Sequence, residues 1–115
     1  AECVSATAKD IEASGMIGSI VGHVGDGNFH VLLLVDTNNP EEVATADGII
    51  SRLASRAIEM DGTCTGEHGI GQGKQKYMQQ EHGNALLLMQ AIKSALDPKN
   101  ILNPGKIWPE ALPKA

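Results

Sequence analysis

The sequence lacks the features that mark several large classes of protein. Its 115 residues include only two cysteines, Cys3 and Cys64, which lie far apart and form no CxxC pair. This argues against a disulfide framework or a thiolate zinc finger and indicates a reducing compartment. No apolar run reaches the roughly 18 residues needed to cross a bilayer, so no transmembrane segment is expected.

Basic residues are scarce as well. Nine lysines and arginines stand against 14 aspartates and glutamates, which gives a formal net charge of −5, and the basic residues are scattered along the chain. A nucleic-acid partner requires a basic face for its phosphates. We therefore expect no nucleic-acid partner.

Phosphate-binding glycine loops are also missing. The GxxxxGK[ST] motif would need glycine at position 68 and serine or threonine at position 75, where the chain has His68 and Gln75. The GxGxxG fingerprint fails because Lys74 and His30 stand where its third glycine belongs. The chain therefore offers no nucleotide-phosphate loop of either type.

Glycine, in contrast, is abundant. The chain has 13 glycines and only three aromatic residues, and glycine at that density suggests a backbone shaped around a site. The length is that of one small domain with a modest core. Because the chain opens with Ala1 rather than methionine, we expect a mature, trimmed or truncated piece of a longer protein.

The first third of the chain predicts a helix followed by a β-hairpin. Residues 3–14 are compatible with a helix that ends at Gly15. Isoleucine, valine and leucine are then frequent on both sides of Asp26-Gly27, one of the strongest signals for a two-residue type I′ turn. The predicted strands are residues 17–25 and 28–35.

Two further helices are predicted downstream. Asn39 offers an N-cap, Pro40 suits the first helical position, and Gly62 would end this helix. Its apolar stripe, which should pack on the sheet, comprises Val43, Ala46, Ile50, Leu53, Ala57 and Met60. A second apolar helix is predicted over residues 84–96, before Asp97-Pro98.

The remaining segments predict little regular structure. Residues 62–74 contain too many glycines for a stable helix and should begin as a short strand and continue as a loop. Residues 101–115 carry three prolines and should be mostly irregular. Together the elements indicate an α+β fold: a small, mainly antiparallel sheet with helices packed on one face. Since two or three strands make a thin sheet, we expect the intact protein to extend it with further strands.

The predicted hairpin brings two histidines into register. A symmetric turn between Asp26 and Gly27 would place His23 opposite His30, with Cβ atoms about 4.5 to 5.5 Å apart on one side of the sheet. That spacing suits a shared metal ion. The alternative is that the histidines are unrelated strand residues, and a one-residue slip would send one imidazole to the other face.

A second group of chemically active residues lies in the glycine-rich segment. Glu67 and His68 are adjacent there, where no helical or core role requires them and where catalytic groups are common. Two histidines and a carboxylate form a ligand set used by zinc and by other divalent metals, which would leave His68 as a base. The sequence does not show whether this segment reaches the hairpin.

Three motifs carry a resemblance that covers residues 22–107. They are GHVGDGNFH at residues 22–30, GTCTGEHGIGQGK at residues 62–74 and LDPKNILNPGK at residues 96–106. In this order and spacing they resemble the carboxyl-terminal domain of the FAD-linked oxidases of the vanillyl-alcohol-oxidase type, the family of D-lactate dehydrogenase and the glycolate oxidase flavin subunit. Residues 1–15 match only in character.

The resemblance implies a role for each matching residue. It implies three ligands for a divalent metal, zinc or manganese: His23, His30 and Glu67. His68 would be the general base beside the flavin, and Asn103 and Lys106 would line the FAD. Residues 1–115 would form part of the carboxyl-terminal domain of a larger two-domain flavoenzyme, without its amino-terminal FAD-binding domain. The fragment alone should be inactive.

The implied reaction is the oxidation of a small 2-hydroxyacid to a 2-oxoacid, with hydride transfer to FAD and a divalent metal orienting the substrate. Leu32 stands where relatives resembling 2-hydroxyglutarate dehydrogenase carry asparagine, which favours a short, uncharged substrate such as lactate or glycolate. The implied partners are the protein's own FAD-binding domain and a downstream electron acceptor, which is a quinone, a cytochrome or an electron-transfer protein. The location would be cytoplasmic or peripheral to the inner membrane.

Two other functions would use the same residues. A non-catalytic metal-binding or assembly module would leave His68 as a spectator, and a metallohydrolase would use the metal to activate water. A purely structural metal usually has four protein ligands, so the adjacent Glu67 and His68 in a glycine-rich loop favour an enzyme. The flavin content of the full-length protein separates these alternatives.

Overall fold

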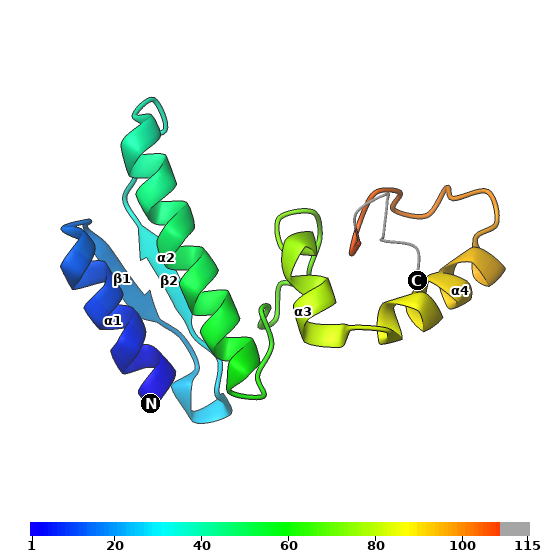
Figure 1. Ribbon diagram of the computed structural model, residues 1–115, viewed down its shortest axis with the longest axis horizontal. Helices are drawn as coiled ribbons and strands as arrows, with labels where there is room; N and C mark the ends of the chain where they lie inside the picture. Colours follow the sequence, from blue (N-terminus) through cyan, green and yellow to red (C-terminus); the bar gives the residue numbers. More distant parts are fainter. Residues whose placement is uncertain (109–115) are drawn as a thin grey trace. The chain divides into compact units, whose positions relative to one another are not determined.

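The computed structural model describes residues 1–108 (Figure 1). The chain divides into two compact units, residues 1–67 and the residues from His68 onward, although its length predicted one small domain. The first unit contains two helices and a hairpin. Only helical elements are assigned among the described residues of the second.

The first unit opens with helix α1, Glu2–Ser14, which ends where the sequence predicted. Gly15 adopts a left-handed conformation, with φ 70°, and its N–H donates to the carbonyl of Glu12. Glycine reaches this conformation without a side-chain clash, which is why it ends the helix. Thr7 and Ile11 are the buried residues of this helix.

Strands β1, Gly18–Val21, and β2, His30–Leu33, form the one sheet found in the described residues (Figure 1). They pair in antiparallel register, with Val21 opposite His30. This confirms the predicted antiparallel hairpin, although both strands are shorter than predicted.

The turn of the hairpin is longer than predicted. A 3-10 turn, η1, covers Val24–Asp26, and the N–H of Asn28 donates to the carbonyl of His23 at 3.2 Å. The predicted two-residue type I′ turn is therefore wrong. That turn needs a positive φ at both Asp26 and Gly27, and of these two only Gly27 has one, at 73°.

Helix α2, Pro40–Glu59, begins where the sequence predicted. The side-chain oxygen of Asn39 accepts hydrogen bonds from the N–H groups of Glu41 and Glu42. These bonds satisfy backbone donors that the first turn of a helix leaves without partners. The cap signal in the sequence is thus confirmed.

The buried face of α2 departs from the predicted apolar stripe. Ala46 is buried as predicted, but Ile49 is fully buried whereas Ile50 is 42% exposed. Two adjacent isoleucines fit a helical stripe almost equally well, so the periodicity alone did not choose between them. Met60 lies just past the last residue of the helix and is 46% exposed, so its predicted core role is also wrong.

Both helices cover one face of the hairpin, where α1 packs beside α2 and against β1 (Figure 1). Gly18 allows this approach, because a Cβ there would lie 2.7 Å from Leu33 Cδ2 and 3.2 Å from Ile11 Cγ2. The buried apolar residues of the unit are Ile11, Ala46, Ile49, Ala54 and Cys64. The predicted α+β class, with helices on one face of a small antiparallel sheet, is confirmed.

Polar contacts also join α1 to α2. Arg56 donates from Nη1 to Thr7 Oγ1 at 3.1 Å and from Nη2 to Asp10 Oδ2 at 2.8 Å. The hydrogen bond from Arg56 holds the pKa of Asp10 below its ordinary value of 3.8. Arg52 approaches Asp10 less closely, with Nε at 3.5 Å from Oδ1. Arg56 is therefore the stronger tie between the helices.

The glycine-rich segment, residues 62–74, forms no strand, so the short strand predicted there is wrong. A strand needs a hydrogen-bonding neighbour, and the described sheet consists of the two hairpin strands without a third strand beside them. The second unit continues with a 3-10 turn, η2, Gln75–Tyr77, and helices α3, Met78–His82, and α4, Ala85–Leu96. The last helix matches its prediction within one residue, whereas α3 was not predicted.

The second unit has a small core, made of Tyr77, Met78 and Leu86. Residues 101–108 contain neither helix nor strand, as predicted. The rest of the tail predicted to be irregular, residues 109–115, lies outside the described residues. Every helix among residues 1–108 is too short or too polar to cross a membrane.

Candidate functional site

The site centres on a contact between the hairpin and the glycine-rich segment, within the first unit. His30 begins β2, and Glu67 is the last residue of the unit. Nε2 of His30 lies 3.4 Å from Oε1 of Glu67, and the two side chains are 30% and 52% exposed. The structure thus brings two predicted metal ligands together at a position that solvent and small ligands can reach.

A hydrogen bond fixes the same carboxylate from another side. Nδ2 of Asn28 donates to Oε2 of Glu67 at 2.6 Å, so the two carboxylate oxygens face different neighbours. No function was predicted for Asn28 from the sequence. The signal available for it was its position two residues before His30, because alternate residues of an extended chain lie on one face.

The structure does not place His23 opposite His30, so the predicted pairing of the two histidines is wrong. Val21 is the partner of His30 in the sheet. His23 instead precedes η1 and is exposed, with φ −96° and ψ 67°. Because the turn is longer, the residue opposite His30 is two positions earlier in the chain than predicted. A shift by an even number of residues leaves each side chain on the same face of its strand.

His68 follows Glu67 in the chain and is the first residue of the second unit. Its side chain is exposed, and the next residue, Gly69, has a φ of 75°. A peptide bond joins His68 to Glu67, so next to Glu67 in the chain stands an imidazole that can bind a metal or a proton.

The donor atoms of His30 and Glu67 fit a shared divalent metal. Two ligands at about 2.0–2.1 Å from a tetrahedral metal lie about 3.3 Å from each other. The observed separation of 3.4 Å is close to this value. Imidazole nitrogen and carboxylate oxygen are ligands of zinc and of other divalent ions. His23 and His68 are the two candidates for a third ligand.

The sheet face that carries His30 is otherwise mostly apolar. Val21 pairs with His30, Ser19 pairs with Leu32, and alternate residues of a strand share one face. On this face Val21 is 49% exposed and Leu32 is 57% exposed. Leu32 therefore forms part of an apolar surface that begins directly beside His30.

In the second unit, hydrogen bonds hold the predicted flavin-lining segment beside the glycine-rich segment. The N–H of Ile107 donates to the carbonyl of Gly71 at 2.8 Å. Nε2 of Gln75 donates to the carbonyl of Gly105 at 2.8 Å. These bonds fix the chain on both sides of Lys106.

Asp97 anchors the loop that leads to this segment. The N–H groups of Ile101 and Leu102 donate to its carboxylate at 3.0 and 2.9 Å, and Lys93 Nζ donates to the same carboxylate. The hydrogen bond from Lys93 and the two backbone donors lower the pKa of Asp97 from 3.8 to about 2. In the sequence, Asp97 was recognised only as part of the Asp97-Pro98 signal that ends a helix, so this role was missed.

A polar hollow of about 580 Å³ lies in this part of the second unit. Asn103 and Lys106, the two residues predicted to line the flavin, contribute to its wall together with Trp108. Asn103 has a φ of 46°, a left-handed conformation that asparagine tolerates better than most residues. Amide and ammonium groups can donate to the carbonyl oxygens of a flavin ring, so these residues fit the edge of an FAD.

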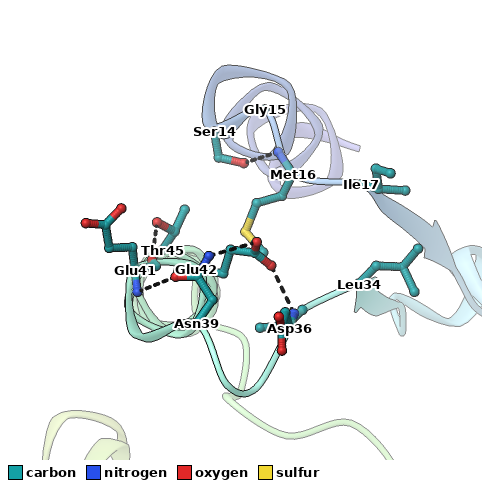
Figure 2. Close-up of a pocket in the computed structure, with 11 residues that line it drawn as sticks. Ser14, Gly15, Met16, Ile17, Leu34, Asp36, Asn39, Glu41, Glu42 and Thr45 are labelled. Carbon is teal, nitrogen blue, oxygen red and sulfur yellow. Dashed lines mark hydrogen bonds between the residues drawn. The ribbon is translucent and has the colours of Figure 1, made fainter.

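Another hollow, of about 630 Å³, lies where the end of α1 meets the start of α2 (Figure 2). None of the predicted site residues lines it. Its acidic groups serve the structure, because the carboxylate of Glu42 accepts hydrogen bonds from the N–H of Asp36 and from Asn39 Nδ2. We assign no catalytic function to this hollow.

Comparison with known proteins identifies the family. The sequence profile described as "FAD linked oxidases, C-terminal domain" matches residues 1–107. The probable mitochondrial D-lactate dehydrogenase of Danio rerio is 49% identical over 88% of this chain and 20% of that protein. D-lactate dehydrogenase (cytochrome) 1, mitochondrial, of Saccharomyces cerevisiae is 50% identical over 89% of this chain and 17% of that protein. Glycolate oxidase subunit GlcD of Bacillus subtilis is 41% identical over 76% of this chain and 19% of that protein.

The chain spans about a fifth of the length of these relatives. Within that fifth, the family match extends over nearly all of the chain and includes the hairpin motif, the glycine-rich segment and the NPGK segment. The resemblance inferred from the three motifs is confirmed. The chain belongs to the family of FAD linked oxidases, C-terminal domain.

Proposed function

We propose that this chain is the metal-binding and proton-accepting part of an FAD-dependent oxidoreductase that converts a small 2-hydroxyacid, of the D-lactate or glycolate type, to a 2-oxoacid. The contact between His30 and Glu67 carries the proposal, because it joins the hairpin motif to the glycine-rich motif at the spacing of two metal ligands. The names of the relatives, D-lactate dehydrogenase and glycolate oxidase subunit, support the substrate class.

His30 and Glu67 would hold a divalent metal, zinc or manganese, with His23 as the third ligand. In the observed register His23 lies two residues beyond the partner of His30. His23 itself lies outside β1, in the turn directly before η1. When bound, the metal would orient and acidify the substrate hydroxyl, and FAD would accept the electrons.

His68 would accept the proton of the substrate hydroxyl. Adjacent residues of an extended segment point in different directions, so Glu67 can face His30 while His68 faces the substrate. The O–H proton would pass to an imidazole nitrogen of His68 as the C–O bond becomes a carbonyl, and FAD, when bound, would accept the carbon-2 hydrogen with its electron pair. A general base of this kind typically contributes about 10² to 10⁴ in rate.

The sheet face around His30 supports a short substrate without a second charge. Val21 and Leu32 flank the histidine on this face, and neither can pair with a second carboxylate. The methyl group of D-lactate or the hydrogen of glycolate would suit this apolar surface. A substrate with a charged tail would lose hydration there without gaining a partner.

Asn103 and Lys106 would line the flavin edge from the second unit. Most of the FAD would be held by an amino-terminal FAD-binding domain of a longer protein. The reduced flavin would then be reoxidised by a quinone, a cytochrome or an electron-transfer protein, in the cytoplasm or at the periphery of the inner membrane.

Anaerobic mixing of the intact protein with D-lactate or glycolate tests the proposal. We expect the flavin absorbance to bleach, the bleaching to be lost after treatment with a chelator, and zinc or manganese to restore it. A preparation without flavin, or bleaching that survives complete metal removal, would contradict the proposal.

Substitution of Leu32 tests the substrate preference. Leu32→Asn should raise the relative rate with D-2-hydroxyglutarate over D-lactate, whereas Leu34→Asn, another exposed leucine near the end of the hairpin, should leave the ratio unchanged. If the ratio of the rate with D-2-hydroxyglutarate to the rate with D-lactate is the same in both variants, Leu32 does not contact the substrate.

A further inference from the structure

We propose that Asn28 is a positioning residue that sets the orientation of the Glu67 carboxylate, and that Gly66 is glycine in order to admit the Asn28 side chain. The inference rests on the proposed metal site. It adds two residues of this chain that the ligand assignment does not contain.

The contacts divide the two oxygens of Glu67 between two neighbours. Oε2 accepts the hydrogen bond from Asn28 Nδ2 at 2.6 Å, while Oε1 lies 3.4 Å from His30 Nε2. A carboxylate held at one oxygen keeps its plane and presents the other oxygen in a defined direction. Partners of this kind orient metal ligands and raise affinity without touching the metal.

The backbone around Asn28 is itself fixed. Its N–H donates to the carbonyl of His23 across the loop, which places Asn28 at the end of the turn and two residues before β2. The amide side chain is also the right chemistry for the contact, because it offers N–H donors to an anion and carries no charge. An aspartate at position 28 would oppose Glu67 with a second negative charge.

Gly66 completes the arrangement. A Cβ at position 66 would lie 2.2 Å from Oδ1, 3.0 Å from Cγ and 3.3 Å from Nδ2, and all three atoms belong to the side chain of Asn28. The φ of Gly66 lies outside the left-handed region, so the backbone itself does not require glycine. The side chain of Asn28 is therefore the reason that a larger residue does not fit.

The affinity of the intact, metal-depleted protein for Zn²⁺ and Mn²⁺, measured by isothermal titration calorimetry, tests the role of Asn28. We expect Asn28→Ala to weaken binding on the order of 10-fold to 100-fold, the range typical of residues that orient metal ligands. Asn28→Asp should weaken it at least as much. Circular dichroism checks that each variant is folded.

Asn38→Ala is the matched control. Asn38 also donates from its side-chain amide to a carboxylate, Oδ1 of Asp36 at 3.3 Å, and it contacts neither His30 nor Glu67 in the hydrogen bonds of the structure. The Asn38→Ala variant should bind Zn²⁺ and Mn²⁺ as tightly as the wild type does. An Asn28→Ala variant that is folded and binds as tightly as Asn38→Ala would overturn the proposal while leaving the metal site intact.

A double substitution tests the link between Gly66 and Asn28. Gly66→Ala should weaken metal binding in the wild type, because the added methyl group displaces the Asn28 side chain. In the Asn28→Ala background, Gly66→Ala should not lower the metal affinity further, because the Asn28 side-chain atoms that the new methyl group would contact are absent. Equal losses in both backgrounds would overturn this explanation of Gly66. A wild type that binds neither ion would overturn the proposed metal site itself and this inference with it, a result distinct from both of the others.

Discussion

The two units of the chain hold their predicted site residues in different ways. In the first, His30 stands on a strand whose hairpin is covered by two helices, and the core of that layer includes the fully buried Ile49. In the second, Asn103 and Lys106 stand on an irregular segment. Backbone hydrogen bonds to the Asp97 carboxylate and a hydrogen bond from Gln75 hold it in place.

The difference predicts how each unit fails. Residues on regular elements depend on the packing of those elements, so loss of a core side chain should disturb the first unit most. A segment held by a buried carboxylate depends on the charge of that carboxylate. The segment that carries Asn103 and Lys106 should therefore respond to acid, as should the contact between Asp10 and Arg56 in the first unit.

The largest stability effect should come from the core of α2. Ile49→Ala removes a fully buried side chain and should lower the free energy of unfolding by about 2–5 kcal/mol. Ile50→Ala, its 42% exposed neighbour, should cost less than about 1 kcal/mol. Equilibrium urea titration measures both, and equal losses would show that the packing described for the first unit is wrong.

The next effect concerns the proposed metal ligands of the first unit. His30→Ala should reduce the metal affinity of the intact protein on the order of 100-fold or more. Loss of a residue that only orients a metal ligand costs up to about 100-fold, and loss of a ligand itself should cost at least as much. His23→Ala should also reduce it, which checks the third ligand. His82 is a suitable control because it too lies beside a carboxylate, 3.5 Å from Glu81, and His82→Ala should leave the affinity unchanged. A His30→Ala variant that binds the metal as tightly as the wild type would contradict the proposed site.

A smaller effect is expected where polar contacts assist the core. Arg56→Ala removes hydrogen bonds to Thr7 and Asp10 and should destabilise the protein by about 1–3 kcal/mol. Arg52→Ala should cost about 0.5 kcal/mol or less, because its side chain is 53% exposed and its contact with Asp10 is longer. Thermal unfolding of the two variants side by side decides whether Arg56 is the tie between α1 and α2.

The smallest effect is a pH dependence of the loop that Asp97 holds in the second unit. The pKa of Asp97 is lowered from 3.8 to about 2, so its stabilising contribution is present above about pH 4 and is lost as the pH falls towards 2. Hydrogen-exchange protection of the Ile101 and Leu102 amides should fall in that window. In Asp97→Asn their protection should be low already at pH 5 and change little on acidification. Protection that stays constant down to pH 2 in the wild type would show that Asp97 does not anchor the loop.

The elements that were predicted correctly depend on signals close together in the chain. The cap at Asn39, the proline after it and the glycine at position 15 each act within one turn of a helix, so their effect is visible without tertiary structure. The family resemblance arose in the same way, from short motifs with fixed spacing. These features gave the α+β class and the identity of His30 and Glu67 as partners.

The errors arose where the choice depended on the rest of the fold. Asp26-Gly27 favours a two-residue turn locally, yet Asp26 stays in a 3-10 turn and the pairing of His30 shifts to Val21. The helical periodicity fits Ile49 and Ile50 almost equally well, and only tertiary packing distinguishes them. Asn28 could not be linked to Glu67 from sequence because the two lie 39 positions apart.

Two adjacent residues have different proposed roles: Glu67 binds the metal, and His68 accepts the proton of the substrate hydroxyl. The most direct test compares Glu67→Gln and His68→Ala in the intact protein, measuring metal content and anaerobic flavin bleaching by D-lactate in the same preparations. Glu67→Gln should lose metal affinity. His68→Ala should retain metal and flavin. Its rate of flavin reduction should be lower than that of the wild type by a factor on the order of 10² or more. Bleaching of metal-replete His68→Ala at the wild-type rate would contradict the account.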